Sequence, residues 1–345
     1  MLKIIIILFA LLTGLAANSQ YTDIDTKAKA LSKQDSKTVE SLAQAISMIA
    51  DTDALKVRAI FVWMSGNISY DLSMFKSGNV RDQTPEGVLK RKTAVCQGYS
   101  ELFKKLCILT GVPCEVVAGY SKGFGYRQGR SFKNTDHAWN TVKINNQWML
   151  LDATWGAGYL NENDDYVASF TEEHFLTAPH RFIIKHLPAD PMWQLMKNPI
   201  DIKTFEKDSN YIKEAVTKNN SNIYINYLDT LSAWEKLDST SKALYSYFRV
   251  VKANPLNADG WYKLGWHYYT LAWKRMEKLN DPKIQRDKNV AVPLANEAIY
   301  YLNQSNSYMK QVSGRDSFYG SDAKQKLQIN ANNIKNLQGI INQYK

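Results

Sequence analysis

Two stretches in the first half of the chain repeat apolar side chains at helical spacing. Between Thr52 and Ser65 they recur every three or four positions, which predicts a helix with one buried face. A second stripe starts behind Cys96 and stops before Gly111, and a glycine there typically ends a helix. The residues of this second stripe are Tyr99, Leu102, Phe103, Leu106 and Thr110. Residues 21–50 predict a more polar helical lead-in.

Extended segments are predicted around and behind these helices. A short one is expected at 67–71, and the glycine- and proline-containing stretch 72–91 is expected to be loop-rich. Residues 115–120 predict a strand, and residues 174–200 predict a strand-like extension punctuated by prolines. Helices followed by strands in this order predict an α+β fold, with N-terminal helices packed on an antiparallel sheet.

The second half shows no strand alternation and carries one repeat signature. The W-x2-L-G-x2-Y pattern of a tetratricopeptide repeat is matched by Trp261, Leu264, Gly265 and Tyr268. In this register 224–257 forms one repeat, and a second begins at 258, with charged residues at 274–290 interrupting it before a return helix at about 293–309. A last helix is expected to close the array through Leu327, Ile334, Leu337 and Ile341. The alternative is a helical bundle without repeats.

These patterns divide the chain into four segments. Residues 1–20 predict a signal peptide, because Lys3 precedes an apolar run that is followed by small residues. That run is shorter than the about 20 apolar residues of a membrane span, and no later stretch qualifies. We therefore expect a secreted or periplasmic protein. The other segments are a helical lead-in (21–50), an α+β domain (51–204) and an all-α, tetratricopeptide-like domain (205–345).

The net charge of +10 narrows the choice of partners. From Lys207 to the end there are 20 Lys/Arg against 12 Asp/Glu, so most of the positive excess lies in the helical half. The basic residues alternate with acidic ones and form no dense run, which disfavours nucleic acid. A mildly basic helical half suits a protein that meets acidic surfaces of the cell envelope.

Cys96 is the candidate nucleophile among three cysteines. It lies at or just before the start of the second predicted helix, where free amides and the helix dipole favour a thiolate. The amides of Cys96 and Gln97 are also placed to stabilise an oxyanion. The alternative is a buried inert thiol. We expect that state for Cys107 and Cys114, because a helix residue and the start of the next strand rarely align for a disulfide.

A predicted hairpin brings a histidine and an aspartate together. Asn145 and Asn146 separate two apolar runs, and asparagine tolerates the positive φ of a two-residue turn. In that register paired residue numbers add up to 291, which makes His137 and Asp152 diagonal neighbours on one face. The carboxylate is then placed to orient the imidazole of a general base. The alternatives are a slipped register, which separates the two, and a surface hairpin with a salt bridge.

Other polar and aromatic residues are weaker candidates. Four side chains are candidates for substrate binding: Trp63, Tyr70, Gln97 and Trp139. For Trp63, packing in the core is the better explanation. We expect no metal, because the spacing of six residues in His174, His180 and His186 fits neither helical nor strand ligand geometry. We expect no cofactor, since the sequence has no CxxC, HExxH, P-loop or GxGxxG motif.

Several motifs in the same order resemble the transglutaminase-like superfamily of papain-type thiol enzymes, in its kyphoscoliosis-peptidase-like branch. The matching stretches are Ala59–Trp63, Asn67–Asp71, Ala94–Ser100, Gly111–Gly123, Asp136–Asn140 and Leu151–Gly158. That branch's C-terminal extension is resembled by Phe175–Thr177, His186–Pro188 and Trp193–Leu195. The resemblance covers about residues 50–200 and leaves the helical half outside.

The resemblance implies a transglutaminase-like, papain-like core and acyl-transfer chemistry. Carried over residue by residue, Cys96 is the nucleophile, His137 the base and Asp152 its orienting carboxylate. The expected substrate is a protein or peptide, and a thioester is resolved by an amine or by water. The alternatives are a cysteine peptidase of the same fold and a non-catalytic scaffold, with the helical half binding a protein partner in either case.

Overall fold

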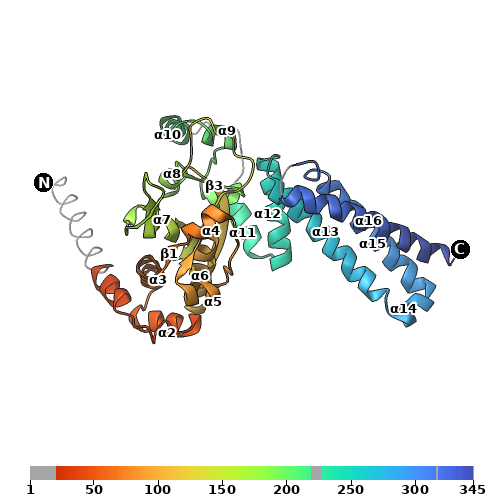
Figure 1. The fold of residues 1–345 in the computed structure, drawn as a ribbon, viewed down its shortest axis with the longest axis horizontal. Coiled ribbons are helices and arrows are strands. Elements are labelled where there is room, and N and C mark those ends of the chain that lie inside the picture. The colour runs from red at the N-terminus through yellow and green to blue at the C-terminus, as the bar shows by residue number, and fades with distance from the viewer. Residues whose placement is uncertain (1–20, 219–226, 316–317, 345) are drawn as a thin grey trace.

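The computed structural model describes residues 21–218, 227–315 and 318–344. The predicted signal peptide at 1–20 and the first residues of the predicted repeat at 224–257 lie outside the described residues. An α+β part precedes an all-helical part, and the long helices α13, α15 and α16 extend away from the α+β part (Figure 1). Among the described residues, no helix is both long enough and apolar enough to cross a membrane.

Helices come first in the α+β part, and the sheet follows. Residues 21–29 are helical, and the next helices are α2 (Val39–Ile49), α3 (Asp53–Asn67), α4 (Leu72–Ser77), α5 (Pro85–Arg91) and α6 (Cys96–Leu109). The main sheet contains β3 (Cys114–Ser121), β4 (His137–Ile144), β5 (Gln147–Leu151) and β8 (His186–Pro188). Two small sheets are formed by β1 (Ser69–Tyr70) with β2 (Thr93–Ala94), and by β6 (Gly158–Leu160) with β7 (Tyr166–Ala168).

The stretch 72–91 is not the loop that its glycines and proline predict. It contains α4 and α5, each begun by a side-chain cap. Asp71 accepts from the amide of Met74, and Thr84 accepts from the amide of Gly87 directly before Pro85. Such N-caps satisfy amides that a helix start leaves free, and proline suits the first helical position. These local capping signals favour helix more strongly than the glycines and proline of the stretch disfavour it.

The hairpin forms in the predicted register. β4 and β5 pair antiparallel, with Asn140 opposite Leu151 and Ile144 opposite Gln147. Asn145 and Asn146 adopt positive φ values of 49° and 63°, as the two-residue turn requires. The full sheet has the order β5-β4-β3-β8, so the late strand β8 pairs with the free edge of β3.

The extension at 174–200 is only partly extended. Its strand is limited to β8, and the remainder consists of turns and short helices. These are η1 (Glu172–His174), α8 (Pro179–Phe182) and η2 (Pro191–Gln194). The prolines explain the difference, because Pro179 and Pro191 open helical turns and donate no hydrogen bond to a sheet.

Helix α6 lies at the centre of the core. It contacts β4 on one side and α2 and α3 on the other, and its predicted stripe from Tyr99 to Leu106 is completely buried. Ile24, Leu42 and Ile46 of the lead-in belong to the same core cluster. The segment 21–50 is therefore an integral part of this layer rather than a separate arm.

The helical part begins after the extension. Its helices are α9 (Ile202–Phe205), α10 (Ser209–Lys218), α11 (Tyr227–Glu235), α12 (Ser239–Ala253), α13 (Ala258–Lys278), α14 (Pro282–Arg286), α15 (Lys288–Met309) and α16 (Phe318–Asn342). The charged interruption predicted at 274–290 is wrong at both ends, because α13 and α15 extend into it. A Cβ at Gly265 of α13 would lie 2.8 Å from Met309, which explains why the signature has glycine where the two helices approach closely.

Polar side chains join the two parts. The hydroxyl of Tyr120 on β3 accepts from the side-chain amides of Asn254 and Asn257 at 2.8 and 2.9 Å. Arg249 of α12 donates to both carboxylate oxygens of buried Asp190 at 2.8 and 2.9 Å. The helical part is thus fixed against the β3–β8 edge of the sheet.

We predict that Arg249→Ala lowers the free energy of unfolding by about 2 kcal/mol, because it removes the bidentate partner of a buried carboxylate. Lys218→Ala is the control, since its ion pair with Glu214 is exposed to solvent and should contribute little to stability. Urea unfolding of both variants measures the difference. Equal effects would mean that the Asp190–Arg249 pair does not stabilise the fold.

Candidate active site

Cys96 is the first residue of α6, as predicted. Val95 is the N-cap and offers no side-chain acceptor to the first-turn amides. Those amides have no partner inside the helix, so they are available to negative charge beside the sulfur. Cys96 is partly exposed, whereas Cys107 and Cys114 are buried, and all three are free thiols. A reagent from solvent therefore reaches Cys96 in preference to the other two.

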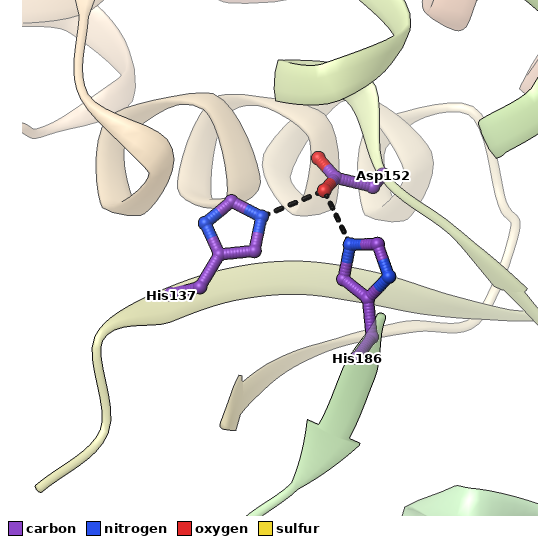
Figure 2. Close-up of side chains that lie close together, drawn as sticks. All are labelled: His137, Asp152 and His186. Atoms are coloured by element: carbon purple, nitrogen blue, oxygen red, sulfur yellow. Dashed lines mark hydrogen bonds and ion pairs between the residues drawn. The ribbon is translucent and has the colours of Figure 1, made fainter. Parts of the chain in front are cut away.

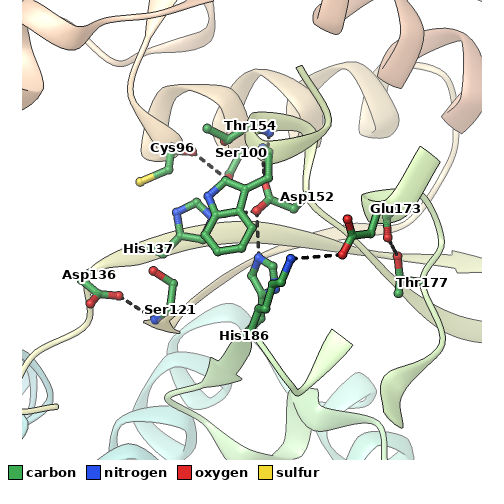
Figure 3. A network of polar contacts seen from close by, with 12 residues as sticks. Cys96, Ser100, Ser121, Asp136, His137, Asp152, Thr154, Glu173, Thr177 and His186 are labelled. Atoms are coloured by element: carbon green, nitrogen blue, oxygen red, sulfur yellow. Dashed lines mark hydrogen bonds and ion pairs between the residues drawn. The ribbon is translucent and has the colours of Figure 1, made fainter. Parts of the chain in front are cut away.

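His137 and Asp152 meet on the sheet, as the hairpin register predicts. His137 opens β4, and Asp152 follows β5 as the N-cap of α7 (Ala153–Ala157). The Nε2 of His137 lies 2.7 Å from Oδ2 of Asp152 (Figure 2). Because Nε2 is engaged, Nδ1 is the nitrogen left for Cys96, whose thiol lies near the ring (Figure 3) and helps to raise the pKa of His137. Sulfur, imidazole and carboxylate thus gather at one place.

A second histidine binds the same carboxylate oxygen. His186, on β8, places its Nε2 3.0 Å from Oδ2 of Asp152 and is 1% exposed. The other oxygen of Asp152 accepts the amides of Thr154 at 2.9 Å and Trp155 at 3.1 Å. The sequence placed His186 in the resembled extension and suggested no role for it beside Asp152, so this contact was not predicted. No short-range signal marks it, because 34 residues separate it from Asp152.

Electrostatics give the two histidines different charges. Burial opposes a charge on His137, but the charge and hydrogen bond of Asp152 outweigh it and raise the pKa of His137 to about 10. Burial lowers the pKa of His186 to about 4, against a smaller opposing effect of Asp152. Burial also disfavours ionised Asp152, yet the two histidines hold the pKa of its carboxyl well below the ordinary range. At neutral pH the cluster therefore holds His137 charged, Asp152 ionised and His186 neutral.

The same three residues are the metal-binding candidates of the described chain. Their ligand-type atoms lie within 4.8 Å of one another. Both imidazoles already donate to the carboxylate in this structure, so a cation would replace two hydrogen bonds. The chemistry of the set suits zinc as well as proton transfer.

The predicted substrate-binding residues fall into two groups. Tyr70 pairs with Ala94 through the β1–β2 ladder, which places it near Cys96, and burial together with the nearby Cys96 raises the pKa of Tyr70. The side chain of Gln97 is exposed and donates to Glu101 at 2.8 Å. Both can meet a substrate.

Trp63 and Trp139 lie inside the protein, with exposures of 1% and 0%. Their burial favours packing roles over substrate contact. Trp155 is the better candidate for substrate contact, since it is half-buried and stacks on His137 with ring centroids 5.1 Å apart. Gly123 of the loop after β3 lies against this ring, where a Cβ would be 2.4 Å from it.

We predict that the His137–Asp152 pair stabilises the fold most at low and neutral pH. The folded-state pKa of about 10 exceeds the ordinary 6.5, so the contribution of charged His137 is complete below 6.5 and is lost as the pH rises through 10. The difference in unfolding free energy between the wild type and His137→Gln should therefore shrink across this range. His180→Gln, at an exposed position, is the control. A difference independent of pH would contradict the assigned charge.

Residues 40–153 match the Transglutaminase-like superfamily. The kyphoscoliosis peptidase of Homo sapiens is 37% identical over 182 residues, which are 52% of this chain and 28% of the relative. The kyphoscoliosis peptidase of Mus musculus is 37% identical over 171 residues, 49% of this chain and 26% of the relative. This chain therefore spans less than a third of the length of either relative.

A solved TGase structure superimposes with a TM-score of 0.28 and 21% identity, over 47% of this chain and 42% of that one. The matched segment 40–153 includes Cys96, His137 and Asp152. The family-model match and the two relatives support a place for the α+β domain in the transglutaminase-like superfamily, in its kyphoscoliosis-peptidase-like branch.

Proposed function

We propose that this chain is an exported cysteine-dependent acyl-transfer enzyme that acts on proteins or peptides. The observation that carries the proposal is the gathering of three residues: Cys96 at the N-terminus of α6, His137 near enough for the sulfur to raise its pKa, and Asp152 at 2.7 Å from His137. A scaffold has no need of these three groups in register. Export is supported by the pattern of residues 1–20 alone.

In the first half-reaction the sulfur of Cys96 attacks a carboxamide or peptide carbonyl. The carbonyl oxygen becomes an oxyanion beside the first-turn amides of α6. His137, charged and held by Asp152, donates its Nδ1 proton to the leaving nitrogen as the C–N bond breaks. Ammonia or an amine departs, and a thioester remains on Cys96.

In the second half-reaction neutral His137 accepts a proton from the incoming nucleophile. An amine gives a new amide, and water gives a carboxylate; in both cases the C–S bond breaks and the sulfur is regenerated. Asp152 stabilises the imidazolium that forms. Cys96, His137 and Asp152 are compatible with either an amine or water as the second nucleophile.

A cysteine peptidase is the second candidate, because the 37% identical relatives are named kyphoscoliosis peptidases. Its first half-reaction is the same, but the bond broken is a backbone amide. We prefer transfer to a side-chain carboxamide, on the superfamily match of residues 40–153.

We also propose that the helical part binds a protein partner as a tetratricopeptide-like array. The signature on α13 supports this, and so does the exposure of Trp266 and Trp273 at 40% and 54% on the same helix. These two residues are seven positions apart and so lie on one helical face.

We predict amine incorporation into glutamine-containing peptides incubated with the protein and a primary amine. Mass spectrometry of the peptides separates the outcomes: a mass gain on glutamine indicates transfer, and backbone cleavage indicates a peptidase. Cys96→Ala should abolish either product. Peptides unchanged by the wild type would favour the scaffold.

We predict that iodoacetamide modifies Cys96 rapidly near neutral pH and at least about tenfold more slowly in His137→Ala, because the imidazolium stabilises charge developing on the sulfur. Buried Cys107 and Cys114 serve as internal controls and should stay unmodified in the folded protein. Peptide mapping identifies the labelled site. Equal rates in both proteins would show that His137 does not act on the sulfur.

A further inference from the structure

His186 is a buried polar group that the three-residue mechanism does not use. It comes from β8, where it pairs with Ser121 of β3, and its Nε2 lies 3.0 Å from Oδ2 of Asp152. The nucleophile, base and carboxylate all precede it by more than thirty residues, so chain proximity does not bring it there. The sheet order does.

The carboxylate of Asp152 is saturated by four donors. Oδ1 accepts two backbone amides at the start of α7, and Oδ2 accepts His137 and His186 (Figure 2). An ionised carboxylate only accepts, so both imidazoles must carry a proton on Nε2. The amides of Thr154 and Trp155 hold Oδ1, and a rotation about the Cβ–Cγ bond of Asp152 would break these bonds and turn Oδ2 away from His137. The His186 bond resists that rotation.

Apolar rings hold His186 in a single orientation. Phe182 stacks on its ring at 4.1 Å between centroids, and Trp155 lies at 4.3 Å. Trp139 approaches edge-on at 5.1 Å. In this surrounding the ring is neutral at physiological pH, so it supplies an N–H donor without a second positive charge that would compete with His137 for the carboxylate.

We propose that His186 is a positioning residue, which holds Oδ2 of Asp152 toward Nε2 of His137 and thereby aims Nδ1 of His137 at the sulfur of Cys96. The inference rests on the proposed acyl-transfer function. It assigns no proton transfer to His186. It makes the extension after the superfamily-matched segment 40–153 a part of the active site.

The test compares His186→Gln with His186→Met, two side chains of similar length of which only glutamine donates an N–H. The probe is p-nitrophenyl acetate: the burst of p-nitrophenolate reports acylation of Cys96, and the steady rate reports deacylation. We expect both rates to fall about 10- to 100-fold in His186→Met, as for misaligned catalytic groups. In His186→Gln the loss of rate relative to the wild type should be at most half as large a factor. Thermal melting confirms that the two variants are equally folded.

His174→Phe is the matched control. This neighbouring histidine is also buried, and in the part of the chain that the structure describes its ring makes no hydrogen bond to Asp152. Its rates should stay within about threefold of the wild type. If His186→Met fails to fold, His186→Phe, which keeps the ring stack without the donor, takes its place in the comparison.

The outcomes separate this inference from the proposed function. A wild type without a burst, or with the same burst in Cys96→Ala, defeats the acyl-transfer proposal. A Cys96-dependent burst with equal rates in His186→Met and His186→Gln defeats the positioning role alone. Activity lost with EDTA and restored by zinc would also overturn it, because the three groups would then be metal ligands. Unchanged rates in EDTA support it.

Discussion

The carboxylate of Asp152 is the point on which the site depends. It accepts two amides of α7 and two imidazoles from different strands, and it is 0% exposed. A buried charge of this kind is tolerated only when its hydrogen bonds are complete. The fold thus has to bring β4, β5, α7 and β8 together before the buried charge is stabilised.

The uneven charge on the two histidines follows from this arrangement. One carboxylate supports one imidazolium, and the geometry assigns that charge to His137, at 2.7 Å rather than 3.0 Å. Burial among aromatic rings keeps the other imidazole neutral. The positive charge therefore lies on the imidazole that is nearer to Cys96.

Local features of the site could be predicted from the sequence. The stripe that follows Cys96 gave its place at a helix start, and two asparagines determined the hairpin register that joins His137 to Asp152. These inferences needed contacts between residues close in sequence. The caps at Asp71 and Thr84 were also readable, but the breaker residues between them dominated the interpretation.

The contact of His186 could not be predicted in this way. It depends on β8 joining the far edge of β3, and strand order is a property of the whole sheet rather than of any window of sequence. The lengths of α13 and α15 were missed for a related reason. Taken by themselves, the charged ends of these helices have the composition of a linker. They are helical because the two helices pack against each other along their length.

The attachment of α12 to the sheet has a consequence for how this architecture can change. Val250 of α12 packs into one apolar cluster with Tyr120 and Leu187, and Trp234 of α11 packs into another with Trp139. Leu187 adjoins His186, and Trp139 contacts its ring. Helices α11 and α12 therefore form part of the packing around the site. Exchanging α11 and α12 for other helices would remove the apolar lining behind the cluster of His137, Asp152 and His186, so the two parts of the chain cannot be recombined freely without disturbing it.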